Sequence, residues 1–229
     1  MIRAILFDFN GVIIDDERIQ MKAYQDVFSG RGIELTEEMY FDCLGMNDHV
    51  FVETIYGKAG KTATAEEIAE DVAGKTSKWK ELLASGFPLF DGVEDVIRRL
   101  RTEFNLGLVS MANREEIDHV LGSTGLAECF DVVMSAEDVT TTKPDPACYR
   151  EGFRRIDLAG VEKGHNPITR RQCVVIEDSP AGVISAKGAR LKALGVSNTV
   201  KADELRKAGA TAVTTDLSDW NAESFRRVF

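Results

Sequence analysis

Apolar runs that stop abruptly at polar residues predict the strands of this chain. The first lies within Arg3–Val12, where the apolar residues give way to Asp8, Asn10 and Gly11. A run without polar alternation is typical of a strand buried on both faces, as in a parallel sheet. Gly11 allows the backbone to turn sharply after such a strand. We therefore expect a buried strand with Asp8 at its carboxyl end.

From residue 89 onward, strand and helix patterns alternate to the end of the chain. Strands are expected at residues 106–109, 132–134, 173–176, 192–196 and 211–214. Between them, Asp145 is expected to cap one helix, with Pro146 at its first position, and Ser179 to cap the next. This order predicts an α/β, Rossmann-like, doubly wound parallel sheet with helices on both faces.

The segment between the first strand and this series has a different pattern. From Arg18 to about Leu83 the apolar residues recur at helical spacing, glycines punctuate them, and no convincing strand is present. The sequence therefore predicts a small helical domain inserted at residues 16–88. The core domain would comprise residues 1–15 and 89–229.

Composition and charge narrow the classes of function. The chain has 229 residues, 44% of them hydrophobic, and a formal net charge of -10. This acidity argues against nucleic acid or an anionic membrane as the main partner. No signal-peptide pattern or membrane-spanning run is present, so a cytoplasmic protein is expected. The four cysteines form no CxxC pair, which disfavours a zinc site or a disulfide framework.

Polar residues at the strand ends supply the candidate chemistry. They are Asp8 with Asn10, Ser110, Lys143, and Glu177 with Asp178. In a parallel sheet these ends share one edge, so the side chains are expected in one crevice. Clustered carboxylates favour a hard divalent cation such as Mg²⁺, and Lys143 and Ser110 can bind phosphoryl oxygens. The pattern indicates a small phosphorylated metabolite as ligand.

Four motifs in order resemble the haloacid dehalogenase superfamily. They are Asp8-Phe9-Asn10-Gly11-Val12, Leu108-Val109-Ser110, Lys143-Pro144-Asp145-Pro146 and Glu177-Asp178-Ser179-Pro180-Ala181-Gly182. Together with the helical insert, they are similar to the capped phosphatase branch, which includes phosphoglycolate-phosphatase-like and β-phosphoglucomutase-like proteins. The likeness covers essentially the whole chain.

The resemblance implies a role for each matching residue. Asp8 would be the nucleophile that forms an aspartyl-phosphate. Mg²⁺ would be bound by Asp8, the Asn10 backbone carbonyl and Asp178, with Glu177 beside them. Ser110, Met111 and Lys143 would hold the transferring phosphoryl group. The helical insert would be a lid that excludes water.

Three further residues are candidates for substrate contact from their position alone. Asn47 and Asp48 lie within the insert, where a solvated turn between helices is the competing interpretation. Arg114 follows the strand that ends at Ser110, near the expected phosphate.

Asn10 departs from the pattern of this family, whose phosphatases and mutases carry Asp at this position as general acid and base. An amide cannot transfer a proton in that role, and such a loss typically costs about 10² to 10⁴ in rate. Three explanations stay open: a slow or selective phosphatase, an engineered substitution, or a protein that binds phosphate without turnover. Asp15, Asp16 and Glu17 could supply a substitute carboxylate or simply form a polar hinge.

The sequence thus favours a Mg²⁺-dependent phosphatase acting on a small phosphomonoester, such as a sugar phosphate or a phosphorylated acid. One alternative is a phosphomutase, which would need a second phosphate site under the lid. The other is a binding protein for a phosphorylated metabolite. The protein is expected to be a monomer or a homodimer.

Overall fold

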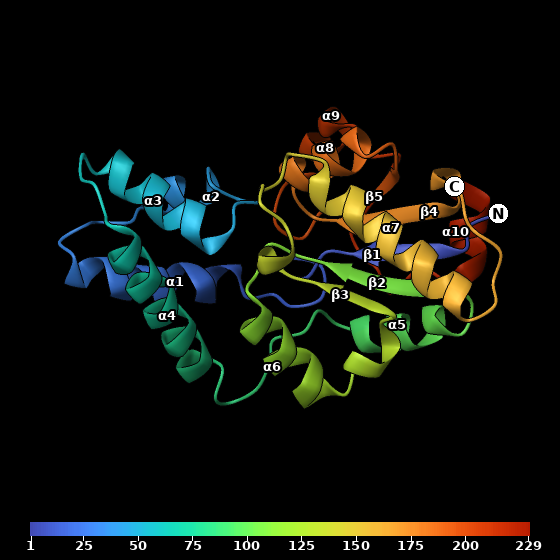
Figure 1. The fold of residues 1–229 in the computed structure, drawn as a ribbon, viewed down its shortest axis with the longest axis horizontal. Coiled ribbons are helices and arrows are strands. Elements are labelled where there is room, and N and C mark those ends of the chain that lie inside the picture. Colours follow the sequence, from blue (N-terminus) through green and yellow to red (C-terminus); the bar gives the residue numbers. More distant parts are fainter.

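Six parallel strands form one sheet at the centre of the molecule (Figure 1). The computed structural model describes all residues, 1–229. The strands are β1 (Ala4–Phe7), β2 (Asn105–Val109), β3 (Val132–Met134), β4 (Cys173–Glu177), β5 (Lys192–Val196) and β6 (Ala212–Thr214). Their spatial order is β3-β2-β1-β4-β5-β6, so the chain winds outward from β1 in both directions. The doubly wound parallel sheet expected from the sequence is confirmed.

Helices cover both faces of this sheet. They are α5 (Val93–Arg101), α6 (Arg114–Thr124), α7 (Ala147–Glu162), α8 (Pro180–Gly188), α9 (Ala202–Ala208) and α10 (Ala222–Val228). Short 3₁₀ turns lie at η1 (Ala127–Cys129), η2 (Ala136–Asp138) and η3 (Arg170–Gln172). None of the helices combines the length and the apolar character that a bilayer crossing requires.

Alternate residues of β1 point to opposite faces and join separate hydrophobic cores. Ile5 and Phe7 pack in a cluster with α5, α6 and α10, whereas Ala4 and Leu6 pack in a second cluster with α7, α8 and α9. All four side chains are fully buried. Burial on both faces explains why the sequence of β1 is continuously apolar.

Two details of the helices differ from the sequence expectations. Helix α10 was not predicted; Phe225 buries it against the sheet, and the ring of Trp220 lies 5.0 Å from the ring of Phe225. Helix α7 begins at Ala147, so Pro146 rather than Asp145 is its N-cap residue. Asp145 still caps the helix in effect, because its Oδ1 accepts a hydrogen bond from the Ala147 amide at 2.8 Å.

The segment between β1 and α5 forms a separate group of helices, here called the helical lobe. It consists of α1 (Glu17–Gly30), α2 (Glu37–Phe41), α3 (Asp48–Lys58) and α4 (Ala65–Leu82), drawn in blue to green in Figure 1. The lobe has its own hydrophobic cluster, in which the rings of Tyr24 and Phe51 lie 4.3 Å apart. As expected, this insert contains helices and no strand.

The register of the sheet brings the predicted polar residues to one edge. Phe7 of β1 is paired with Leu108 of β2 and with Ile176 of β4. The residues that follow these positions therefore emerge at the same carboxyl edge, beneath the helical lobe. Asp8 and Glu177 become neighbours although 168 residues lie between them in the 229-residue chain.

Two helix glycines allow the packing of α7 on the sheet to be tested. A Cβ added at Gly152 of α7 would lie 2.6 Å from Val109 Cγ2, whereas nothing lies within 4 Å of the same position at Gly122 of α6. Overpacking costs about 1 to 3 kcal/mol, which exceeds the gain of about 1 kcal/mol from removing a helix glycine. We expect Gly152→Ala to lower the free energy of unfolding by about 1 kcal/mol. Gly122→Ala should raise it by up to about 1 kcal/mol.

Urea unfolding followed by circular dichroism measures both changes. An equal response of the two variants would show that α7 does not approach the sheet as closely as described.

Candidate active site

The ammonium group of Lys143 lies between carboxylates from two strand ends. Its Nζ is 2.8 Å from Asp8 Oδ1 and 2.6 Å from Glu177 Oε1. Tyr149 donates a further hydrogen bond to Glu177 Oε1 at 2.7 Å. Carboxylate oxygens of Asp8, Glu177 and Asp178 lie within 4.8 Å of one another, and all three residues are buried. Asp8, Lys143, Glu177 and Asp178 are called the acid–lysine cluster below.

The turn from β4 into α8 fixes one side of this cluster. The second carboxylate oxygen of Glu177 accepts hydrogen bonds from the backbone amides of Asp178 and Ser179 and from the Ser179 hydroxyl. Ser179 also caps α8 as predicted, since its Oγ accepts from the Gly182 amide. A Cβ at Gly182 would lie 1.8 Å from Glu177 Oε1, so this position has no room for a side chain.

The turn after β1 fixes the opposite side. Gly11 has a φ of 72°, and a Cβ there would lie 1.9 Å from Asp178 Oδ2. Any other residue would therefore displace the Asp178 carboxylate as well as strain the backbone. The Thr199 hydroxyl donates a hydrogen bond to the same oxygen. No sequence signal distinguished Thr199, because it lies in a polar turn after β5.

Burial and mutual repulsion perturb the charges of the cluster. Burial, followed by the nearby Glu177 charge, raises the pKa of Asp8 to about 7. The same two causes, with Asp8, raise the pKa of Asp178 well above its usual range. Burial alone would lower the pKa of Lys143, but Asp8 and Glu177 outweigh it and raise that pKa. One ammonium therefore balances three carboxyls incompletely.

This donor set fits a hard divalent cation. Carboxylate oxygens are the ligands that Mg²⁺ prefers, and a cation between Asp8 and Asp178 would relieve the repulsion that raises their pKa values. The absence of a side chain at Gly11 lets the Asp178 carboxylate lie against the backbone of the turn after β1, on the same side as Asp8. The structure thus contains an acidic group that can bind a metal ion.

Ser110 and Met111 lie where the sequence placed them, at the end of β2. Both are buried and line the same cavity as Asp8 and Lys143. The Ser110 hydroxyl oxygen accepts a hydrogen bond from the Ala112 amide at 3.0 Å, which leaves its proton free for an acceptor in the cavity.

Asn10 connects the cluster to the base of the helical lobe. Its Nδ2 donates a hydrogen bond to Asp16 Oδ1 at 2.9 Å, while Trp79 Nε1 and Gln20 Nε2 donate to Asp16 Oδ2. Burial raises the pKa of Asp16 to about 6, and the hydrogen bonds from Asn10 and Trp79 limit the rise. Asp16 therefore links the turn after β1, α1 and α4 through one buried carboxyl group.

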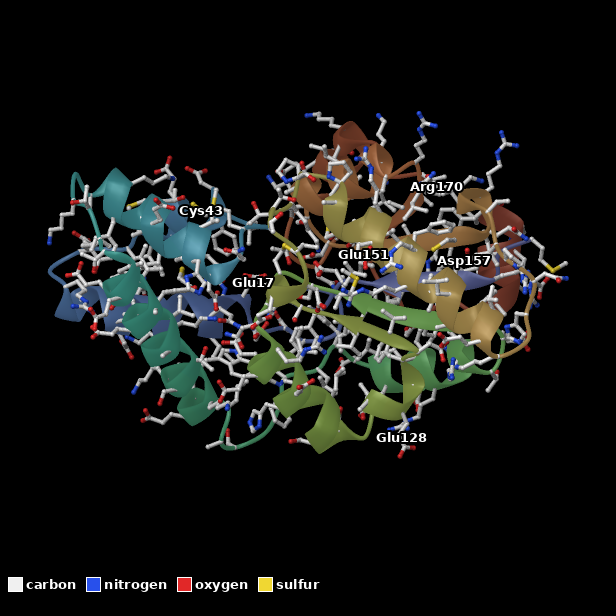
Figure 2. All side chains as sticks on the ribbon, viewed as in Figure 1. Glu17, Cys43, Glu128, Glu151, Asp157 and Arg170 are labelled. Atoms are coloured by element: carbon white, nitrogen blue, oxygen red, sulfur yellow. The ribbon has the colours of Figure 1, made fainter.

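Among the three acids weighed as substitutes for the missing Asp, only Glu17 lines the cavity. Asp15 is exposed, and Asp16 is fully buried with both carboxylate oxygens occupied. Glu17 lies at the junction of the lobe and the sheet domain (Figure 2), where the Tyr40 hydroxyl donates to its Oε2 at 2.7 Å. Burial, followed by the Asp16 charge, raises the pKa of Glu17 to about 7.

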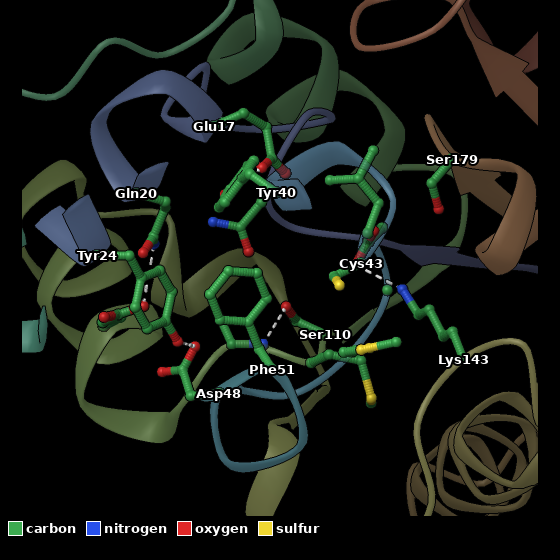
Figure 3. A pocket seen from close by; sticks show the side chains of 18 of the residues that line it. Glu17, Gln20, Tyr24, Tyr40, Cys43, Asp48, Phe51, Ser110, Lys143 and Ser179 are labelled. Atoms are coloured by element: carbon green, nitrogen blue, oxygen red, sulfur yellow. Dashed lines mark hydrogen bonds and ion pairs between the residues drawn. The ribbon is translucent and has the colours of Figure 1, made fainter. Parts of the chain in front are cut away.

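Further polar groups of the cavity come from the lobe (Figure 3), and one comes from α6. Lys75 of α4 forms ion pairs with Asp48 Oδ2 at 2.6 Å and with Glu116 Oε1 at 2.8 Å. Tyr24 donates to the other Asp48 oxygen at 2.6 Å. Asp48 was a candidate from the sequence, whereas Lys75 and Glu116 were not. Single charged residues on helices are usually solvated, and no spacing rule links α4 with α6.

Two candidates for substrate contact are not brought to the cavity. Asn47 caps α3 by accepting from the Val50 amide at 2.9 Å, and it lies outside the group of cavity-lining residues. Arg114 points toward β3, where its Nη2 donates to the Val133 carbonyl and to Asp138. Arg114 is thus directed away from the cavity, because a residue at the start of a helix can point away from the strand end that precedes it.

The fold and the acid–lysine cluster define an α/β protein with an acidic, lysine-containing site under a helical lobe. Residues 5–196 match the family model described as haloacid dehalogenase-like hydrolase, and the chain belongs to this family.

Known proteins extend this comparison. Hexitol phosphatase B of Escherichia coli K12 is 27% identical over 97% of this chain and 96% of its own length. The chloroplastic protein SUPPRESSOR OF QUENCHING 1 of Arabidopsis thaliana is 27% identical over 95% of this chain, which corresponds to 20% of that larger protein. The crystal structure of β-phosphoglucomutase from Clostridium difficile has a TM-score of 0.85 at 20% identity, covering 100% of this chain and 97% of the other. The resemblance inferred from the four motifs is confirmed.

The raised pKa of Glu17 predicts a pH dependence of stability in the absence of divalent cations. In the unfolded chain this carboxyl loses its proton near its ordinary pKa of 4.5, but in the folded protein it does so near 7. Between these values the folded state holds the extra proton, so the free energy of unfolding falls as the pH rises. Glu17→Gln keeps an acceptor for Tyr40 and should reduce this fall.

Urea midpoints measured in chelator between pH 4.5 and pH 7.5 test the effect. Glu38→Gln, on the exposed side of α2, is the control and should follow the parent protein. A Glu17→Gln profile as steep as that of the parent would contradict the assignment.

Proposed function

We propose that this protein is a phosphatase that hydrolyses a small phosphomonoester through a covalent intermediate on Asp8. The observation that carries the proposal is the position of Lys143, whose ammonium is 2.8 Å from Asp8 Oδ1 in a buried cavity that also contains Ser110. A carboxylate nucleophile beside a fixed cation and a hydroxyl donor suits phosphoryl transfer. The phosphatases among its relatives support the same reaction.

In this reaction a carboxylate oxygen of Asp8 attacks phosphorus, and the bond between phosphorus and the alcohol oxygen breaks. Water then hydrolyses the aspartyl-phosphate, which releases inorganic phosphate and regenerates Asp8. Lys143 and Ser110 bind the phosphoryl oxygens, on which negative charge is concentrated. Mg²⁺ held by Asp8, Asp178 and the Asn10 carbonyl would neutralise part of the same charge.

The helical lobe is the proposed cap domain, with boundaries at residues 16–88. Trp79 and Ala23 of the lobe belong to the same hydrophobic cluster as β1, and Lys75 is paired with Glu116 across the junction. These contacts hold the lobe over the carboxyl edge of the sheet and exclude water from the cavity. Exclusion of water strengthens the electrostatic interactions of Lys143 with bound phosphate.

Asn10 limits the rate of the proposed reaction. Its amide donates to Asp16 and has no proton to give to the leaving alcohol oxygen. This observation favours a second function, binding of a phosphorylated metabolite with little or no turnover. The two functions share the same phosphate site and differ only in proton transfer.

Restoring the carboxylic acid at position 10 separates the two functions. We expect Asn10→Asp to raise phosphate release from p-nitrophenyl phosphate and small phosphomonoesters by about 10² or more with Mg²⁺ present. Buried next to Asp16, the new carboxyl group should favour its protonated form, which is the form a general acid requires.

The control is Asp8→Asn in the Asn10→Asp background, which should abolish turnover because the nucleophile is lost. If Asn10→Asp binds phosphate but releases none from any compound, the phosphatase proposal fails and the binding protein takes its place.

A further inference from the structure

The side of the cavity that faces the helical lobe is lined by more carboxyl groups than cationic groups. Opposite the acid–lysine cluster, the cavity is bounded by the carboxyl groups of Glu17, Asp48 and Glu116 and by one ammonium group, that of Lys75. The carboxyl groups come from α1, α3 and α6, three elements distant in sequence. The part of a substrate that extends away from the phosphate would therefore meet mainly hydrogen-bond acceptors.

Lys75 has no proton left for a ligand. An ammonium group donates three hydrogen bonds. Those of Lys75 are directed to Asp48 Oδ2 at 2.6 Å, Glu116 Oε1 at 2.8 Å and Gln20 Oε1 at 3.1 Å. The side chain is 1% exposed, so it cannot turn toward the cavity without breaking these bonds. The positive charge of Lys75 is thus balanced by the carboxylates of Asp48 and Glu116 and is not available to a ligand.

No other cation faces this side of the cavity. Lys143 is the remaining cationic residue of the lining, and it is bound to Asp8 and Glu177 at the phosphate end. Arg114, the nearest candidate by sequence, is directed to Asp138. A second phosphate or a carboxylate on the ligand would therefore lie beside carboxylates without a partner of opposite charge. Such like-charge contacts strongly disfavour a ligand.

Hydroxyl groups have the opposite preference. Each can donate to a free lone pair on Glu17 or Asp48, and each can accept a hydrogen bond in turn. Buried acceptors of this kind discriminate well between ligands that do and do not satisfy them.

From this arrangement we infer that the substrate is the monophosphate of an uncharged polyol. The inference rests on the proposed phosphatase function and narrows it. Phosphorylated acids and bisphosphates are excluded, and so is a mutase reaction that needs a second phosphate to bind under the lobe.

Two six-carbon compounds test the inference directly. Sorbitol 6-phosphate and 6-phosphogluconate have the same phosphate and the same four secondary hydroxyl groups, and they differ at the far end in an alcohol versus a carboxylate. We expect kcat/KM for sorbitol 6-phosphate to exceed that for 6-phosphogluconate by about tenfold or more. Equal values, or a preference for the acid, would overturn the inference.

Neighbouring glutamates of α6 supply a matched pair of variants. Glu116→Gln removes one cavity carboxylate but keeps an oxygen that can accept from Lys75. It should lower the ratio of kcat/KM for sorbitol 6-phosphate to kcat/KM for 6-phosphogluconate several-fold, because 6-phosphogluconate is used better. Glu115→Gln changes an exposed residue whose partner is Lys80, 2.5 Å away, and should leave the ratio unchanged. Asp48→Asn repeats the test from the lobe in case Glu116→Gln does not fold. An unchanged ratio in the folded cavity variants would contradict the inference.

Failure of the inference can be told apart from failure of the proposed function. If p-nitrophenyl phosphate is hydrolysed but sorbitol 6-phosphate is not preferred over 6-phosphogluconate, the phosphatase function stands and the polyol substrate is rejected. If neither the protein nor its Asn10→Asp variant hydrolyses any compound, the phosphatase is rejected, and calorimetric titration with the same two compounds and Mg²⁺ compares their affinities instead. A tenfold or greater preference for sorbitol 6-phosphate in binding would then support the polyol site by itself.

Discussion

The ion pairs of Lys143 are the constraint on which the functional end of the molecule depends. Three carboxyl groups are buried within a few ångströms at the edge of the sheet, an arrangement that is costly unless positive charge lies among them. Lys143 supplies part of that charge, and the backbone amides at the start of α8 supply hydrogen bonds to Glu177. Two glycines, Gly11 and Gly182, leave the space that the carboxylates occupy. The remaining excess of negative charge fits the site to bind a cation.

Much of the fold was predictable because strands that are buried on both faces have continuous apolar sequences. Strand β5 has the predicted bounds, since a continuous apolar run leaves little ambiguity. The part of the site at the sheet edge was also predictable, because Asp8, Ser110, Lys143 and Asp178 all follow strands of a parallel sheet. Helix α10 escaped prediction because one buried residue, Phe225, gives no periodicity to detect.

The lobe side of the cavity could not be predicted in the same way. Asn113 and Glu116 have the spacing of a capping box, and Asn113 does accept from the Glu116 amide at 3.0 Å. The Glu116 side chain, however, does not return to the helix start but extends to Lys75 across the junction. Which lysine meets which glutamate depends on how the lobe sits on the sheet domain, and no local rule of sequence determines that position.

The strand order has a consequence for the making of the protein. Among the six strands, β1 is synthesised first, and 165 residues lie between Phe7 at its end and Cys173 at the start of its partner β4, so one edge of β1 stays unpaired while they are made. Until then β2 is the only strand beside β1, and the residues of β4 and α8 that pack around β1 are absent. Glu177, the last residue of β4, and Asp178 are synthesised after Lys143, so the lysine precedes both of these carboxylates in the growing chain. A nascent chain interrupted before β4 would therefore expose an unpaired, apolar strand edge that is prone to aggregation. Protection by a chaperone would matter most before β4 is synthesised.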